Sequence, residues 1–488
     1  MSKGHWGLIS KFALSFGGSV RKYLLSLVSI ILFSAMSASA DDLKKITILQ
    51  TADIHSRTGT DSLPGLRQLA AALDSARKKA GGDDKCLLID CGDILQGSFA
   101  GACSKGAVGL GFLNDLKYDA WIPGNHDFDF GTDRFLEIMQ ECSPTIIAAN
   151  LLVGGKRPAH AWKIIEKDSV RIALIGLTTP SLDRWHWGPI CEGLGAIGID
   201  DVLDEMIPKI MDSKCDMIIL AVHQGMFQND SNDSNLNRIT EKYPQIDLVL
   251  GAHSHQGVPG EIIGISSWYS QAEAYCASFS RIVAEIDVRR HRTTKIESML
   301  IPVPANSDSS FKFSRGLENL LSKSREEGGK ELVFLKNEIV ADELNRMTAD
   351  AYLMSAPSAA SALMIPQERT INAGKFTEED LYWTFPFEDT VCTISLSEPE
   401  LATVMDEAAK LKDNTRFILV GGEGRRVEGA RRMIVLSSYL LAGAGGRVTS
   451  LAKFAGNPTC RASDTGVTLR DAFRKYLKHH GAGVPPAK

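Results

Sequence analysis

The chain has 488 residues, which is too long for one hydrophobic core, so we expect two domains. Apolar residues make up 44% of the sequence and charged residues 23%, as in an ordinary globular protein. The formal net charge of −5 provides no broad positive field, which excludes attraction to nucleic acid polymers. Small anionic substrates stay open, because bound metal ions outweigh the net charge locally.

The first forty residues predict a signal peptide. They combine basic residues, an apolar run over Leu24–Ala35 and a small-residue cleavage site at Ala38–Ala40. The basic residues are Lys3, Lys11, Arg21 and Lys22. We expect cleavage after Ala40, which changes the net charge from −5 to −9 and leaves a periplasmic or secreted protein without a membrane span. An uncleaved anchor is the alternative, although the apolar run is short for about 30 Å of hydrocarbon.

From Ile46 to Pro304, short apolar runs alternate with helix-like stretches, which is typical of layered α/β domains. Apolar periodicity predicts helices over Leu66–Lys79 and Ile199–Met211. The expected strands are Ile46–Leu49, Cys86–Ile89, Ala120–Ile122, Ile172–Ile175, Met217–Val222 and Ile246–Leu250. None of the nine cysteines forms a C-x-x-C pattern, so a thiolate zinc site has no support. Cys86 and Cys91 are expected to pack as small apolar residues.

A polar, helix-prone segment follows this region. Residues 306–330 begin with a Ser- and Asp-containing loop and end near a Gly-Gly pair. We interpret them as a linker between a first domain at 41–305 and a second α/β domain at 331–480. A short tail occupies 481–488.

Five of the apolar runs end directly in polar residues. In chain order these are Asp53 and His55, Asp90 and Asp93, Asn125 to Asp127, His223, and His253 and His255. Since the carboxyl ends of parallel strands meet at one edge of a sheet, these side chains are expected to converge. Asp, His and Asn supply oxygen and imidazole donors, which suit Mn²⁺, Zn²⁺, Fe or Co. Each piece alone is a weak signal, because Asn after Gly also forms turns; their order and number carry the prediction.

In this order the motifs resemble those of the calcineurin-like metallophosphoesterases, and among them the two-domain 5′-nucleotidase family. They are Asp53-x-His55, Gly92-Asp93, Gly124-Asn125-His126-Asp127, His223 and Gly251-Ala252-His253-Ser254-His255, with the nucleotidase-like extension Asp90–Ser98. The resemblance covers most of residues 46–290. It implies an α/β protein with a four-layer α/β/β/α metallophosphoesterase domain and a smaller α/β nucleotidase-type C-terminal domain.

The resemblance also implies roles for these residues. Two divalent metal ions are expected, one held by Asp53, His55, Asp93 and His255, the other by Asp93, Asn125, His223 and His253. Asp93 would bridge them, because a shared carboxylate reduces the repulsion between two close cations. His126 would be catalytic rather than a ligand, with Asp129 favouring its cationic form. The alternative for Asp129 is a solvated loop carboxylate, and Asp90 is either a partner of the ligands or a plain strand-end residue.

The C-terminal region resembles the nucleotidase substrate domain more weakly. Its first motifs match at Thr377–Tyr382 and Phe385–Thr390. Phe417 and Tyr439 stand where the family places two rings that clamp the base, a contact that tolerates different bases. Ordinary core packing is the alternative for both rings.

Two features of the family are absent from this region. The N-G-G-G-I-R loop is not recognisable, and Arg369 is the candidate replacement for its guanidinium. The G-G-D-G segment reads Gly443-Ala444-Gly445-Gly446, without the Asp. The hydrolytic chemistry is therefore better supported than the preference for a nucleotide.

The sequence predicts an exported phosphoesterase that hydrolyses nucleoside 5′-monophosphates, with 2′,3′-cyclic nucleotides as a further substrate class, through a metal-activated water. One alternative keeps the metal site and changes the substrate to a sugar phosphate, a nucleotide sugar or a sulfur ester. Another is a binding protein with a vestigial site, which the complete ligand set disfavours. Metal identity and oligomeric state are left open.

Overall fold

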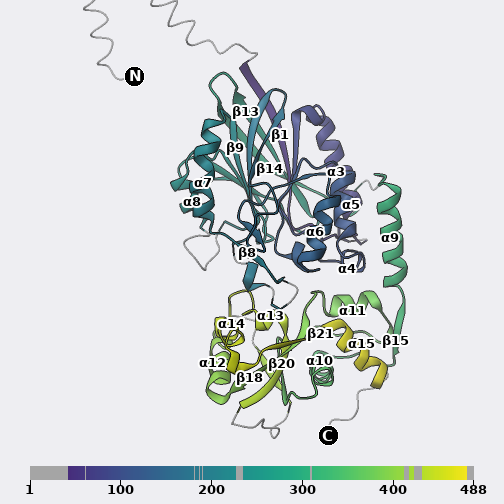
Figure 1. Cartoon of the computed structure of the whole chain (residues 1–488). Helices are drawn as coiled ribbons and strands as arrows, with labels where there is room; N and C mark the ends of the chain where they lie inside the picture. Colours follow the sequence, from purple (N-terminus) through teal and green to yellow (C-terminus); the bar gives the residue numbers. More distant parts are fainter. Residues whose placement is uncertain are drawn as a thin grey trace, which may run out of the picture.

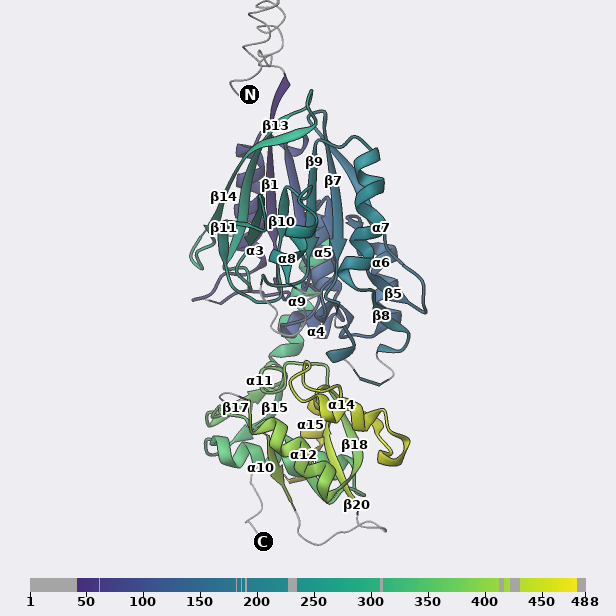
Figure 2. The ribbon, with the colours of Figure 1, turned by 90° about the vertical axis from the view of Figure 1, so that its left-hand side faces the viewer.

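The computed structural model describes residues 42–480 apart from 61, 181, 186, 189–190, 227–234, 308–309, 412–416 and 422–430. The expected signal peptide and the tail at 481–488 lie outside the described residues. Two domains follow one another along the long axis of the molecule, and α9 (Arg315–Gly328) leads from the first to the second (Figures 1 and 2). None of the described helices is long and apolar enough to span a membrane.

Two six-stranded sheets form the centre of the first domain. One has the order β14-β13-β1-β2-β3-β4 and the other β11-β12-β10-β9-β7-β6. The strands of the first sheet are β1 (Leu43–Thr51), β2 (Cys86–Asp90), β3 (Ala120–Trp121), β4 (Thr145–Ile146), β13 (Ser278–Asp287) and β14 (Arg292–Pro302). Those of the second are β6 (Trp162–Lys167), β7 (Val170–Leu177), β9 (Met217–Val222), β10 (Leu248–Leu250), β11 (Val258–Ile263) and β12 (Ser267–Gln271). A separate short pair joins β5 (Leu151–Val153) to β8 (Leu194–Ala196).

The alternation of side chains along each strand produces the layers. In β1, Ile48 lies in the core between the two sheets and Leu49 in the core beneath the helices. In β9, Ile219 lies between the sheets and Leu220 faces the helices of the other side. One helical layer contains α3 (Leu66–Lys79), α4 (Phe99–Cys103), α5 (Ala107–Asp115) and α6 (Thr132–Glu141), and the other contains α7 (Ile199–Asp212) and α8 (Leu236–Lys242). The predicted α/β/β/α arrangement is confirmed.

The predicted elements correspond closely to the observed ones. The helix predicted over Leu66–Lys79 is α3 with the same bounds, and the one predicted over Ile199–Met211 is one residue shorter than α7. Cys86 and Cys91 pack in different cores, on either side of the first sheet. In the expected linker, Leu317 of α9 is buried in the helix-side core of the first domain, so this helix is packed against that domain.

The second domain is a five-stranded sheet of order β19-β16-β20-β18-β21 with helices on both faces. Its strands are β16 (Ser361–Met364), β18 (Thr390–Ser397), β19 (Ile418–Val420), β20 (Arg431–Ser437) and β21 (Ser463–Thr468), and β15 (Glu331–Leu335) pairs with β17 (Gly374–Thr377) beside it. Its helices are α10 (Ala341–Ser355), α11 (Glu378–Thr384), α12 (Glu398–Ala408), α13 (Ser438–Leu441), α14 (Thr449–Ala455) and α15 (Leu469–His480). The Thr377-to-Asp380 motif has a structural cause, because the two residues form the capping box of α11.

Candidate metal centre and adjoining cavity

The polar residues that follow the strands of both sheets converge at one edge of the first domain. Two groups have ligand atoms that all lie within 4.8 Å of one another: Asp53, His55 and His255 form the first, and Asp93, His223 and His253 the second. The fully buried Asn125 immediately precedes His126, whose backbone N–H donates to Asp93 Oδ1 at 2.7 Å. The structure thus brings together six of the seven residues predicted as ligands, and Asn125 directly precedes a residue that contacts Asp93.

The backbone of these residues is strained. Asp53, His55, Asp93, His253 and His255 all have left-handed conformations, with φ between 52° and 68°. A non-glycine residue adopts this region rarely, and clusters of such residues mark functional sites because surrounding contacts must hold them there. Five of the seven predicted ligands share this feature, which points to a site shaped for ligation rather than for stability.

Two glycines let the second group come close together. A Cβ on Gly92 would lie 2.7 Å from His223 Nδ1, and one on Gly124 would lie 2.3 Å from Asp93 Oδ1. Both positions therefore require glycine for the approach of backbone to side chain. The glycines of the second and third motifs are explained by packing around Asp93 and His223.

Hydrogen bonds aim the imidazoles at a common centre. His55 Nδ1 lies 2.7 Å from Gln96 O, and His223 Nδ1 lies 2.7 Å from Cys91 O, so each ring turns Nε2 inwards. His55 Nε2 and His255 Nε2 face each other at 3.3 Å.

Asp93 Oδ2 and His223 Nε2 are 3.1 Å apart and deeply buried, yet within the described chain neither makes a hydrogen bond of proper geometry. Buried polar atoms normally have a partner. Side chains directed at a shared point, with no sulfur donor among them, fit two divalent cations. The donor set does not select one metal.

Burial and the charges of neighbouring groups shift the pKa values of the candidate ligands, some upwards and some downwards. Burial raises the pKa of Asp53 to about 7, and burial lowers those of His55 and His253 to about 3. Although burial opposes it, Asp93 raises the pKa of His223 to about 9. Neutral imidazoles at His55 and His253 have the free lone pair that a metal needs, whereas His223 must release its proton on metal binding.

Asp127 holds the two metal-binding loops together. Its carboxylate accepts hydrogen bonds from the backbone N–H groups of Asp93, Ile94, Leu95 and Gly124 at 2.8–3.0 Å. Asp127 belongs to one of the sequence motifs, but no role was predicted for it from the sequence. An acidic residue next to a Gly-Asn-His triplet is the signal that identifies such a clamp.

His126 and Asp129 lie at the boundary between the metal centre and the second domain. His126 Nδ1 lies 3.0 Å from Asp129 Oδ2, and the carboxylate is almost fully buried. Burial opposes protonation of His126, but Asp129, followed by Asp93, raises its pKa to about 10. Since Asp129 occupies Nδ1, the proton on Nε2 is the one available to a substrate. Asp129 is therefore no solvated loop residue.

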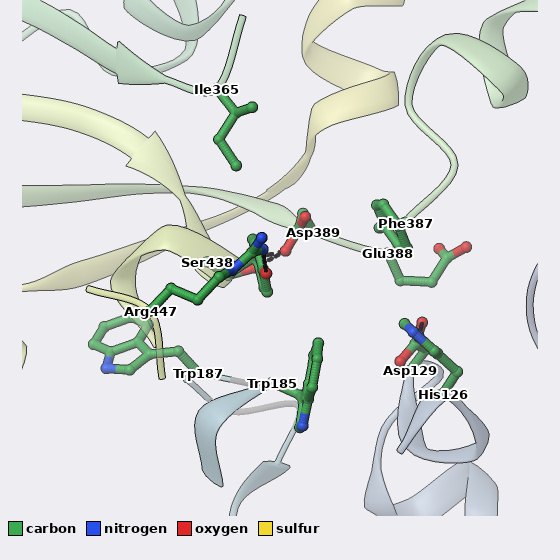
Figure 3. Close-up of a pocket in the computed structure, with 11 residues that line it drawn as sticks. His126, Asp129, Trp185, Trp187, Ile365, Phe387, Glu388, Asp389, Ser438 and Arg447 are labelled. Carbon is green, nitrogen blue, oxygen red and sulfur yellow. Dashed lines mark hydrogen bonds and ion pairs between the residues drawn. The ribbon is translucent and has the colours of Figure 1, made fainter. Parts of the chain in front are cut away.

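A cavity of about 250 Å³ adjoins His126 and lies between the two domains. Figure 3 shows Trp185 and Trp187 entering it from the first domain, opposite Phe387 and Asp389 of the second. The Phe387 ring stacks on His126 with centroids 5.7 Å apart. Trp185 lies edge-on to the metal-group residue His253 at 5.1 Å, so the cavity opens directly from the metal centre.

The residues predicted to bind substrate have different positions. Tyr439 lines the cavity, with its ring stacked towards Trp185 at 6.3 Å between centroids. Phe417 is only 6% exposed, lies in the core of the second domain and does not line this cavity, so it fits the core-packing alternative. Arg369 is exposed, donates to the carbonyl of Trp383 and lines a neighbouring cavity of about 490 Å³. The sequence interpretation missed Trp185 and Trp187, which lie only two residues apart.

The metal-binding loops also contact the second domain directly. Gln96, whose carbonyl meets His55, donates from Nε2 to Pro386 O at 2.6 Å. The Arg57 guanidinium lies 4.3 Å from the Tyr275 ring centroid and 4.6 Å from that of Trp383. A cation between two rings, one from each domain, stabilises their contact.

A sandwich of two sheets with paired Asp/His groups at the strand ends defines a phosphoesterase-type metal domain. The family model of the calcineurin-like phosphoesterases matches residues 46–257. Similar curated proteins include a snake venom 5′-nucleotidase of Crotalus adamanteus, 30% identical over 253 residues, or 48% of this chain and 40% of that protein. A 2′,3′-cyclic-nucleotide 2′-phosphodiesterase/3′-nucleotidase of Salmonella typhimurium is 23% identical, over 49% of this chain and 41% of that protein. These alignments span about two fifths of the relatives' length.

Over this region the chain is similar to the calcineurin-like phosphoesterases and to curated 5′-nucleotidases. Similar solved structures extend the likeness in fold to both domains. A Staphylococcus aureus protein assigned as a 5′-nucleotidase has a TM-score of 0.74 at 16% identity, covering 90% of this chain and 98% of that one. A sulfate thiohydrolase of Thermus thermophilus has a TM-score of 0.63 at 16% identity, covering 91% and 95%.

Proposed function

We propose that this protein is an exported, metal-dependent phosphoesterase that hydrolyses nucleoside 5′-monophosphates to nucleoside and phosphate. The observation that carries the proposal is the meeting of two Asp/His groups with the His126–Asp129 pair at the mouth of an aromatic-lined cavity. The nucleotidases among the similar proteins support the substrate class. Export rests on the expected signal peptide.

The roles proposed for the chain's own residues follow from their positions. Asp53, His55 and His255 would hold one cation, His223, His253 and Asn125 the other, and Asp93 both. Two divalent cations supply an activated water and neutralise the phosphoryl oxygens. His126 presents its Nε2 proton to the departing oxygen, while Asp129 keeps the ring cationic and oriented.

The second domain contributes a water-excluding wall. Phe387 covers one face of His126, and Trp185 approaches both His126 and His253. Excluding water strengthens the electrostatic contact of His126 with developing negative charge. The leaving group would then occupy the cavity that these rings border.

A phosphate-release screen of the purified full chain tests the proposal. The substrates are nucleoside 5′-monophosphates, 2′,3′-cyclic nucleotides, sugar phosphates and nucleotide sugars, each with added Mn²⁺, Zn²⁺ or Co²⁺. We expect turnover of nucleoside monophosphates to exceed that of ribose 5-phosphate and glycerol phosphate. Equal turnover of the non-nucleotide esters rejects the nucleotidase proposal, and no turnover of any ester supports a binding protein instead.

The thiohydrolase-like fold makes sulfur esters a second class to include in the screen. Release of sulfate from a thiosulfonate ester, without phosphate release from any substrate, would assign this class. The His126–Asp129 pair is compatible with a departing sulfur as well as a departing oxygen, so the screen rather than the metal centre decides.

A further inference from the structure

The cavity beside His126 has two flat walls that come from different domains. Trp185 follows a short helical turn of the first domain, and Tyr439 lies in α13 of the second. Their rings are inclined by only 24° and their centroids are 6.3 Å apart. Near-parallel faces at this separation form a slot, since edge-to-face packing would close it.

The floor of this slot is a glycine. The Gly445 N–H donates to Arg184 O at 3.1 Å, which fixes the loop to the residue before Trp185. A Cβ on Gly445 would lie 3.2 Å from the Trp185 ring and 3.3 Å from Tyr439 Oη, and its φ is +68°. The segment that lacks the family's Asp is therefore the segment that admits Trp185 next to Tyr439.

The carboxylates around the slot disfavour a second phosphate there. Asp389 accepts from Ser438 Oγ and from the Tyr439 N–H, both at 2.9 Å, and burial raises its pKa to about 6. Glu388 pairs with Arg470, and Asp129 adds a third carboxylate near the cavity. Apart from His126, which pairs with Asp129, Arg447 is the one basic residue among the described lining residues, and it already donates to Tyr439 Oη and to Ala444 O.

We propose that Trp185 and Tyr439 together form the specificity slot for a flat, uncharged aromatic leaving group, in which Trp185 of the metal domain takes the role that the sequence resemblance gave to Phe417. This inference rests on the proposed function for its substrate. A ring held between two others needs about 7–8 Å between the planes of the two flanking rings, so the slot widens by about 1 Å on binding. Binding of the leaving group is then coupled to the spacing of the two domains, because each domain supplies one wall.

Adenosine 5′-monophosphate and ribose 5-phosphate provide the test, because they differ only in the base. The readout is the ratio of kcat/KM for the two esters, measured for wild type, W185L, W185F and Y439L. F334A is the matched control, since Phe334 is an exposed ring of the same chain that does not line the cavity. Metal content is measured for each variant, because Trp185 touches His253.

We expect W185L and Y439L to lower this ratio about 5- to 150-fold, the range that one stacked ring contributes, and W185F to retain most of it. F334A should keep the wild-type ratio. A ratio that W185L leaves unchanged overturns the slot, whether or not both rates fall together. That result would leave the proposed hydrolysis intact.

Calorimetric titration of adenosine into the full chain tests the slot without hydrolysis. Adenosine carries no phosphate, so its binding is measured without the contact between phosphate and the metal centre. We expect W185L to weaken its affinity at least about fivefold. Equal affinity of wild type and W185L, or no measurable binding to wild type, overturns the inference. If wild type hydrolyses neither ester but this difference in affinity appears, the proposed function fails and the slot stands.

Discussion

The two domains meet at one cavity but differ in how strictly they constrain their residues. At the metal edge of the first domain, five polar residues have left-handed backbones and two glycines admit no side chain. At the substrate side, the walls are rings from separate segments, Trp185, Phe387 and Tyr439. Metal ligation needs given donors at given points, whereas stacking needs only a flat face. Sequence motifs therefore specify the metal site more completely than they specify the aromatic walls.

Substitution of the shared carboxylate should have the largest effect, because the first domain has no substitute for it. We expect Asp93→Asn to lower metal content and to abolish detectable phosphate release, as chelation of the wild type should also do. Metal analysis and phosphate assay check this. Asp84→Asn is the control at the opposite end of β2, where Asp84 is exposed. Full activity of Asp93→Asn would contradict the proposed bridge.

Replacement of His126 should separate catalysis from ligation. We expect His126→Gln to reduce kcat by about 10²- to 10⁴-fold, the usual contribution of a proton-transfer group, with metal content unchanged. The control is His291→Gln, because His291 forms a comparable pair with Asp216, at 2.6 Å, away from the metal edge. If His126→Gln loses metal instead, the residue is a ligand and the assignment of a separate acid is wrong.

The pH dependence should reveal how Asp129 acts. Burial alone would lower the pKa of His126, and Asp129 is the main group that raises it. In Asp129→Asn the pKa of His126 falls, so the cation is lost at a lower pH. We expect the alkaline limb of the kcat/KM profile to move to lower pH, with the smallest loss of activity at the acidic end. An unshifted limb with uniformly lower activity would indicate a purely structural role for Asp129.

The smallest effect is expected at Phe417. Phe417→Leu keeps an apolar side chain in the core, so we expect a loss of about 1 kcal/mol in the free energy of unfolding and a KM for nucleotide within about twofold of wild type. Denaturant unfolding and steady-state kinetics measure the two quantities. A large rise in KM without loss of stability would indicate that Phe417 contacts the substrate. It would also weaken the contrast between a metal site that motifs specify and aromatic walls that they specify less completely.

Local rules predicted the metal edge, whereas the four layers were implied by the resemblance of the motifs to a known family. The apolar alternation in β1 and β9 sends neighbouring residues to different cores, and the polar residue after each strand lies at the edge. The role of Asp127 escaped prediction, because four backbone N–H groups from two loops meet it only in three dimensions.

Only part of the substrate wall could be predicted from the sequence: Tyr439 lines the cavity, but Trp185 was missed and Phe417 lies in the core. Phe417 and Trp185 are both aromatic, and nothing in either local pattern says which ring is buried in a core and which faces a cavity. Trp185 reaches Tyr439 only because the two domains pack together. A contact across a domain boundary has no periodicity along the chain that could reveal it.

Gln96 contacts both a candidate metal ligand of the first domain and the backbone of the second domain. Its carbonyl meets the ring of His55, and its side chain donates to the backbone of Pro386 in the other domain. Coupling between two binding equilibria is reciprocal. If the contact between the domains increases the affinity of His55 for a cation, the bound cation stabilises the association of the domains by the same free energy. Chelation should therefore loosen the pairing of the domains as well as stop turnover, and proteolysis of the chain around α9 would report it.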